Sequence, residues 1–123
     1  MSNNERITLQ WNVAAESLPK PAVKVLLNLS LFGMEALVRG GTLEVGAELN
    51  DGASEIVVRA TGPRIAFDET VGKALEGSLP EDQLSSRTAP AALIQAVAQE
   101  LGGGVQYALS DGALVLGAVL PGA

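Results

Sequence analysis

The sequence predicts an α/β two-layer sandwich, a mixed β-sheet with helices on one face. Several short segments alternate apolar and polar residues with the period of a strand. Two longer segments are apolar around most of a helical circumference, which is typical of helices buried on several sides. With 123 residues, 47% of them hydrophobic, the chain is long enough to bury a core. We therefore expect residues 1–123 to form a single domain.

Eight elements are expected in the order β-α-β-β-α-α-β-β. The first is a strictly alternating strand at 6–13, followed by a helix at 21–38 that begins at a proline and ends at Gly40-Gly41. The others are strands at 42–49 and 54–60 joined by Asn50-Asp51-Gly52, a helix at 67–76, a polar loop at 77–88, a helix at 89–101, and a hairpin of 105–110 and 113–120 turning at Asp111-Gly112. The helices that begin near 21 and 89 should pack side by side on one face of the sheet. The helix after 66 should be shorter and less well packed.

Composition excludes several classes of function. Fourteen acidic and eight basic residues give a net charge of -6, which argues against a nucleic-acid partner. The absence of cysteine and histidine excludes disulfides, thiolate metal sites and the commonest general base. No apolar run of about 18 residues is present to span a membrane, and the N-terminus does not resemble a signal peptide. A soluble, cytoplasmic protein is expected.

Motifs for catalysis or cofactor binding are missing. Gly72-Lys73 lacks the upstream glycine and the following Ser or Thr of a P-loop. The three glycines at 102–104 close a helix, whereas a dinucleotide fingerprint opens one. The carboxylates are scattered singly over predicted surfaces. We expect no catalytic residue, no cofactor and no metal site in this chain.

The element order and the glycine positions resemble the ATP-binding domain of sensor histidine kinases, the Bergerat fold. The first helix of that family carries N-x-x-x-N. Asn28 matches its first position, but Phe32 replaces the asparagine that holds the magnesium-phosphate group. The next motif, D-x-G-x-G, reads ATGPR. Ala60 replaces the aspartate that binds the adenine amino group, Gly62 is retained, and Arg64 replaces the second glycine.

The third motif, G-x-G-L-A, opens the last helix and cradles phosphate on backbone N–H groups. Here it reads TAPAA, with Thr88 and Pro90 at the glycine positions, and proline removes a donor. A hydrogen bond to a charged group contributes about 1.5–3 kcal/mol, so three losses sum to roughly 5–9 kcal/mol. The binding free energy of a micromolar site is only about 8 kcal/mol. The resemblance therefore implies a degenerate nucleotide pocket that no longer binds ATP.

Two stretches, LPKPAVKVLLNLSLFGMEALVRGGTLEV and AQELGGGV, resemble one branch in particular, the histidine phosphotransferases of ChpT type. That resemblance implies a phosphorelay protein in which a dimeric helical hairpin bears a phosphoacceptor histidine. A degenerate kinase-like domain follows the hairpin and docks the receiver domains of response regulators and of a hybrid kinase. The hairpin and its histidine are not in these 123 residues. Transfer by this chain alone is not expected, and a homodimer is expected only through the hairpin.

The residues themselves leave other interpretations open. Phe32 is most simply a core residue, Asn28 can satisfy a backbone group, and Arg64 can be an ordinary surface charge. Lys24, Asn28, Glu35 and Arg39 should form the solvated side of the first helix, where the nucleotide pocket once opened. Two alternative functions follow, an interaction module outside phosphorelay or a kinase-like domain with weak nucleotide binding.

Overall fold

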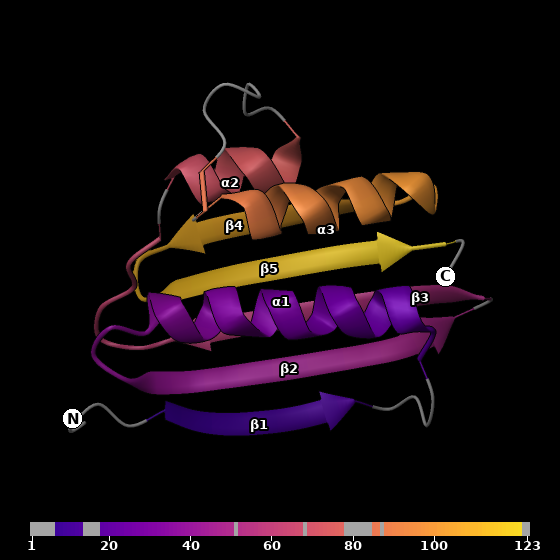
Figure 1. The fold of residues 1–123 in the computed structure, drawn as a ribbon. Helices are drawn as coiled ribbons and strands as arrows, with labels where there is room; N and C mark the ends of the chain where they lie inside the picture. Colours follow the sequence, from indigo (N-terminus) through magenta and orange to yellow (C-terminus); the bar gives the residue numbers. More distant parts are fainter. Residues whose placement is uncertain are drawn as a thin grey trace.

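The computed structural model describes residues 7–13, 18–50, 52–67, 69–77, 85–86 and 88–121. They form a five-stranded mixed sheet with helices on one face, so the predicted fold class is confirmed (Figure 1). The elements are β1 (Ile7–Val13), α1 (Lys20–Ala36), β2 (Gly41–Asn50), β3 (Ala53–Thr61), α2 (Glu69–Glu76), α3 (Ala89–Glu100), β4 (Gly104–Ser110) and β5 (Ala113–Leu120). The strand order is β1-β2-β3-β5-β4, in which β1 runs parallel to β2 and the other neighbours are antiparallel.

Both predicted hairpins form. Asn50 pairs with Ala53, and Ser110 pairs with Ala113, so each turn contains two residues. Gly52 and Gly112 have φ of 81° and 76°, a conformation that glycine adopts without strain and that such tight turns require. Residue 51 and most of the predicted loop at 77–88 lie outside the described residues.

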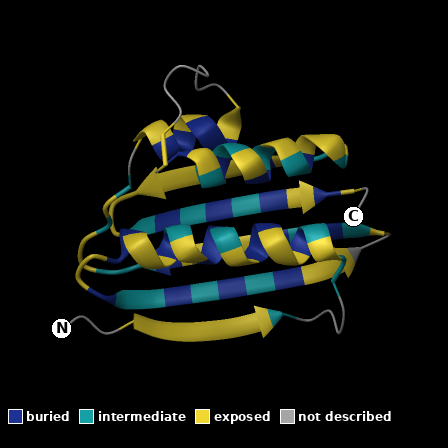
Figure 2. Ribbon diagram, viewed as in Figure 1, coloured by how far each residue is buried: buried dark blue, intermediate teal, exposed yellow. Residues whose placement is uncertain are grey.

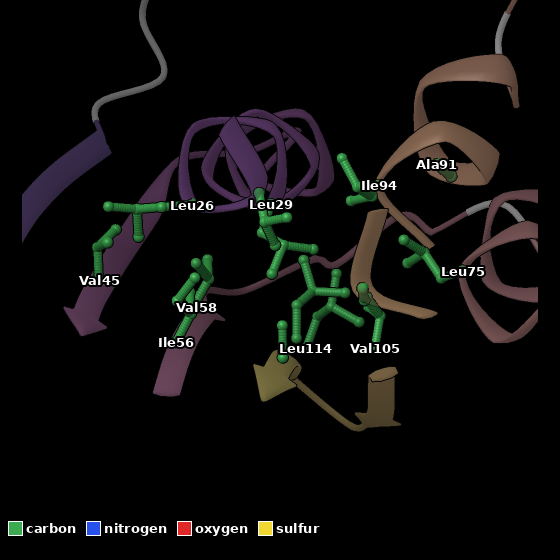
Figure 3. Packing of buried hydrophobic residues seen from close by; sticks show 14 of the residues in the cluster. Leu26, Leu29, Val45, Ile56, Val58, Leu75, Ala91, Ile94, Val105 and Leu114 are labelled. Carbon is green, nitrogen blue, oxygen red and sulfur yellow. The ribbon is translucent and has the colours of Figure 1, made fainter. Parts of the chain in front are cut away.

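The core lies between α1 and the middle strands. Leu26 and Leu29 point from α1 toward the sheet, where they meet side chains such as Val45 and Val58 (Figure 3). Leu29, Val45 and Val58 are fully buried. Each buried side chain of this size contributes about 1.5–3 kcal/mol before conformational entropy is subtracted. Alternation along the strands and apolar spacing along α1 therefore place the core where the sequence predicts it.

α1 ends at Ala36, two residues earlier than predicted. The backbone N–H of Leu37 donates to the carbonyl of Met34 at 3.1 Å, which closes the last turn. Gly40 and Gly41 then reverse the chain with φ of 77° and 137°. A side chain at Gly41 would collide with the carbonyl oxygen of Thr61.

Within the described ranges, no helix has both the length and the hydropathy to cross a membrane.

α1 and α3 lie side by side on one face of the sheet, as predicted (Figure 1). α2 is shorter than either, also as predicted, but the expectation that it packs less well is wrong. Val71, Ala74 and Leu75 are buried where α2 meets α3 and β4. Gly72 allows the Tyr107 ring to approach, since a Cβ there would lie 2.6 Å from its Cζ.

Candidate functional site

Two adjoining clefts open along α1 at the place where the resemblance predicts the nucleotide pocket. The first, of about 400 Å³, lies between the second half of α1, the end of the segment after β3, and α2. The second, of about 560 Å³, lies between α1 and the start of α3. The first is lined by Phe32, Glu35, Ala36, Val38, Ala66, Phe67 and Val71, and the second by Asn28, Leu31, Phe32, Glu35, Ser86 and Pro90. Phe32 and Glu35 line both clefts, so the two form one continuous region.

α1 contributes a stripe to this region because residues at i, i+4 and i+7 share one side of a helix. The Asn28 side-chain amide donates to the carbonyl of Lys24, four residues earlier, at 2.8 Å. Phe32 is half-buried and packs against the core. Lys24 and Glu35 are exposed, as predicted for the solvated side of the helix, whereas Arg39 is exposed but lies beyond the end of α1 at Ala36. The side-chain amide of Asn28 therefore bonds to its own helix, and Phe32 places a ring in the region.

The three positions of the second motif lie outside both clefts. Ala60 is fully buried in β3, between Leu43 of β2 and Leu114 of β5. The backbone N–H of Gly62 donates to the carbonyl of Gly112 at 3.1 Å. Arg64 is exposed.

Gly62 has a structural reason to be glycine. A Cβ at this position would lie 2.5 Å from the carbonyl oxygen of Gly40. The turn after α1 and the segment after β3 therefore approach each other closely here. The glycine of the second motif is needed for this packing whether or not a nucleotide binds.

The start of α3 carries the remnants of the third motif. Thr88 is buried, and its Oγ1 accepts a hydrogen bond from the backbone N–H of Ser85 at 2.9 Å. It makes no side-chain cap to the helix. Pro90 occupies the first turn and lines the second cleft, where it presents a ring in place of an N–H. The helix end therefore offers an anion fewer donors than a glycine-rich motif would.

The electrostatics of the region are unfavourable for a nucleotide. Among the described residues that line the two clefts, Glu35 is the one that is charged. Among the described lining residues, no lysine or arginine offsets this carboxylate for an approaching triphosphate. Across the part of the chain that the structure describes, no group of three or more Asp, Glu, His or Cys residues is placed to hold a metal ion.

Sequence reasoning placed some lining residues and missed others. Asn28, Phe32 and Pro90 come together in one cleft, whereas Ala60 and Gly62 do not line it. The motifs gave no signal for the contribution of Phe67, whose ring lies 5.1 Å from that of Tyr107, or for that of α2. Glu35 lines both clefts, in agreement with its predicted place in the stripe of the first helix where the pocket once opened.

Comparison with known proteins identifies the family. The model of the histidine phosphotransferase C-terminal domain matches residues 1–113. The chain belongs to this family. It is 30% identical over 99 residues to the protein phosphotransferase ChpT of Brucella abortus (strain 2308), which covers 80% of this chain and 47% of that protein. This histidine phosphotransferase domain thus spans about half the length of that relative.

Solved structures agree with this assignment. The 1.7 Å structure of a bacterial phosphotransferase superposes with a TM-score of 0.78 at 28% identity, covering 94% of this chain and 56% of that one. The catalytic domain of the histidine kinase ThkA superposes with a TM-score of 0.66 at 18% identity, covering 94% of this chain and 78% of that one. At this lower identity the likeness shows the fold alone. The predicted histidine-kinase ATPase-like topology is confirmed.

Proposed function

We propose that this domain serves a phosphorelay by docking receiver domains, including that of a hybrid kinase, and that it has lost ATP binding. Family membership supports the phosphorelay role. The chain contains no histidine, so the phosphoacceptor must be supplied by polypeptide outside these 123 residues. In longer family members we expect that polypeptide to form a helical hairpin that also dimerises the protein.

The position of Phe32 is the observation that supports the loss of ATP binding most directly. Phe32 lines both clefts, and Glu35, which also lines both, is the one charged residue of the lining that the structure describes. Pro90 removes a donor from the neighbouring helix end. The aromatic ring supplies no ligand for magnesium, the carboxylate repels the triphosphate, and the missing N–H leaves the phosphate with one donor fewer.

Receiver docking requires a surface that does not repel an acidic partner. The phosphorylation pocket of a receiver is acidic and this domain carries a net charge of -6, so long-range attraction cannot drive the contact. Local cations can still orient it. Arg39 and Arg64 are both exposed. Arg39 directly precedes Gly40 and Arg64 lies two residues after Gly62, and these two glycines are in near contact. We assign these two arginines to the docking surface, with affinity in the micromolar range and modest salt dependence.

The experiment joins this chain to the N-terminal part of the Brucella phosphotransferase and measures phosphotransfer to a cognate receiver. Transfer should be fast with the domain present and slower by an order of magnitude or more without it. Arg64→Glu should slow transfer, whereas Arg59→Glu, an exposed arginine on strand β3, should not. Equal rates with and without the domain would show that it is only structural. Saturable ATP binding would instead support the kinase-like alternative.

A further inference from the structure

The helix layer stops short of β1. Figure 1 shows helices in front of the sheet from β2 to β4, and none in front of β1. In the parallel register Leu9 lies beside Leu43 and Trp11 beside Val45. Leu43 and Val45 are fully buried on the helix side, yet Leu9 and Trp11 are 55% and 50% exposed. β1 therefore carries apolar side chains that no helix of the described residues covers, and Figure 2 colours almost the whole strand as exposed.

The flank of α1 nearest β1 is also apolar. Val23, Leu27 and Met34 follow one another at i, i+4 and i+11, which is one side of a helix, and all three are exposed. The opposite flank is occupied, since Pro21 and Lys24 line a shared cleft with Val97 of α3. We call the resulting surface the α1/β1 trough, formed by Ile7, Leu9, Trp11, Val23, Leu27 and Met34. None of these six side chains is charged.

The dimensions of the trough fit a helix. α1 makes its most extensive sheet contacts with β3, which is two strands away from β1. Two strand spacings amount to about 10 Å, and packed helices lie about 8–10 Å apart. A helix placed over β1 would therefore lie beside α1 at the usual distance. Its contacts would be the stripe of α1 on one side and the β1 side chains below.

A second copy of the chain fits less well. Pairing of the free edge of β1 with another β1 would place the two α1 helices about five strand spacings, or roughly 24 Å, apart. Helices at that distance do not touch, so Leu27 and Met34 would stay exposed. The backbone groups at the edge of β1 would then be hydrogen-bonded, but the apolar flank of α1 would not be covered.

The family assignment supplies a source for the helix. The matched model is a C-terminal domain, and the part of the curated relative that aligns with this chain is only 47% of that protein. Longer members therefore carry polypeptide that enters this domain just before β1. The geometry points to the α1/β1 trough as the docking site of an amphipathic helix from that N-terminal polypeptide, with its apolar side on Leu27 and Trp11. This inference rests on family membership and not on the proposed docking of receivers.

Trp11 provides the readout because it is the only tryptophan of the chain. The complete chain is joined to the N-terminal part of the Brucella phosphotransferase, and acrylamide quenching of Trp11 is compared with that in the chain alone. The same proteins carrying Trp11→Phe give the background. Burial of a half-exposed indole should reduce quenching by about threefold and shift its emission to the blue.

Two variants make the test specific. Leu27→Glu places a charge in the trough and should restore the quenching seen in the chain alone. Leu93→Glu is the matched control, because Leu93 is similarly exposed but lies on α3, and it should change nothing. Circular dichroism of each variant verifies that it is folded. Quenching that is the same with and without the N-terminal part would overturn the inference. So would a dimer of the chain alone that protects Trp11 and dissociates with Leu27→Glu, which would make a second copy the occupant.

Discussion

Gly33 of α1 lies directly against Leu43 of β2. A Cβ at position 33 would lie 2.7 Å from Cδ1 of Leu43 and 3.0 Å from Cγ1 of Val58. The absence of a side chain lets α1 approach the sheet closely, at the turn of the helix next to Phe32. A glycine that is unfavourable for an isolated helix is thus favourable for this packing.

We predict that Gly33→Ala lowers the free energy of unfolding by about 1–2 kcal/mol. Overpacking a tight core costs about 1–3 kcal/mol, which exceeds the gain of up to about 1 kcal/mol in helix propensity. Urea denaturation measures the change. Gly46→Ala is the control, because its Cβ would meet only the carbonyl oxygen of Asn12 at an ordinary 3.7 Å. A Gly33→Ala protein as stable as the wild type would show that α1 can shift without cost.

Gly62→Ala should also destabilise the protein, by about 2–3 kcal/mol, in the absence of any nucleotide. Its Cβ would meet the backbone oxygen of Gly40 at 2.5 Å, and a backbone atom cannot rotate away. Thermal unfolding by circular dichroism measures the loss. Gly104→Ala should be nearly neutral because nothing lies within 4 Å of its Cβ. If both substitutions were neutral, the retained glycine of the second motif would need another explanation.

Ser54→Ala should stabilise the protein by about 1 kcal/mol. Among the described residues, Ser54 is fully buried in β3 and its Oγ has no hydrogen-bond partner. Removing an unsatisfied buried hydroxyl removes its desolvation penalty. Thr88→Val provides the contrast, because Oγ1 of Thr88 accepts a hydrogen bond from Ser85 and its loss should cost about 1 kcal/mol. Chemical denaturation of both variants should give changes of opposite sign, and a loss of stability in Ser54→Ala would contradict the assignment.

The sequence predicted the strands and two long helices almost to the residue, because each has a strong local signal. Alternation set β1, β2, β3 and β5, while Pro21 and Gly40-Gly41 bounded α1. The packing of α2 was not predictable in this way. It depends on a gap at Gly72 that the ring of Tyr107 fills, and those two residues are 35 positions apart in sequence.

The candidate site was only partly predictable for the same reason. Asn28 and Phe32 are placed by helical spacing, which the sequence contains. The burial of Ala60 depends on the neighbouring strands, and the lining by Phe67 depends on how the segment after β3 crosses α1. Motif positions therefore located the region, but tertiary contacts decided which of the residues face it.

Phe32→Asn should not create an ATP site. The substitution restores the side chain at one motif position, but Pro90 still lacks an N–H and Ala60 remains in the core. Calorimetric titration with magnesium and ATP should give the same absence of saturable heat as in the wild type. Leu93→Asn, on the exposed side of α3, controls for the added amide. Saturable binding by Phe32→Asn alone would mean that Phe32 is the single block to nucleotide.

The central claim is that this domain keeps the kinase-like fold but no longer binds ATP. Calorimetric titration of the unmodified chain with ATP and magnesium tests this claim most directly. The described lining of the two clefts includes an aromatic ring that reaches both, one carboxylate and a proline at the helix end, and it includes no lysine or arginine. We expect no saturable heat up to about 1 mM, the range of a site with only about 4 kcal/mol of binding free energy. A dissociation constant in the low micromolar range would contradict the account and make this domain a nucleotide-binding, kinase-like protein.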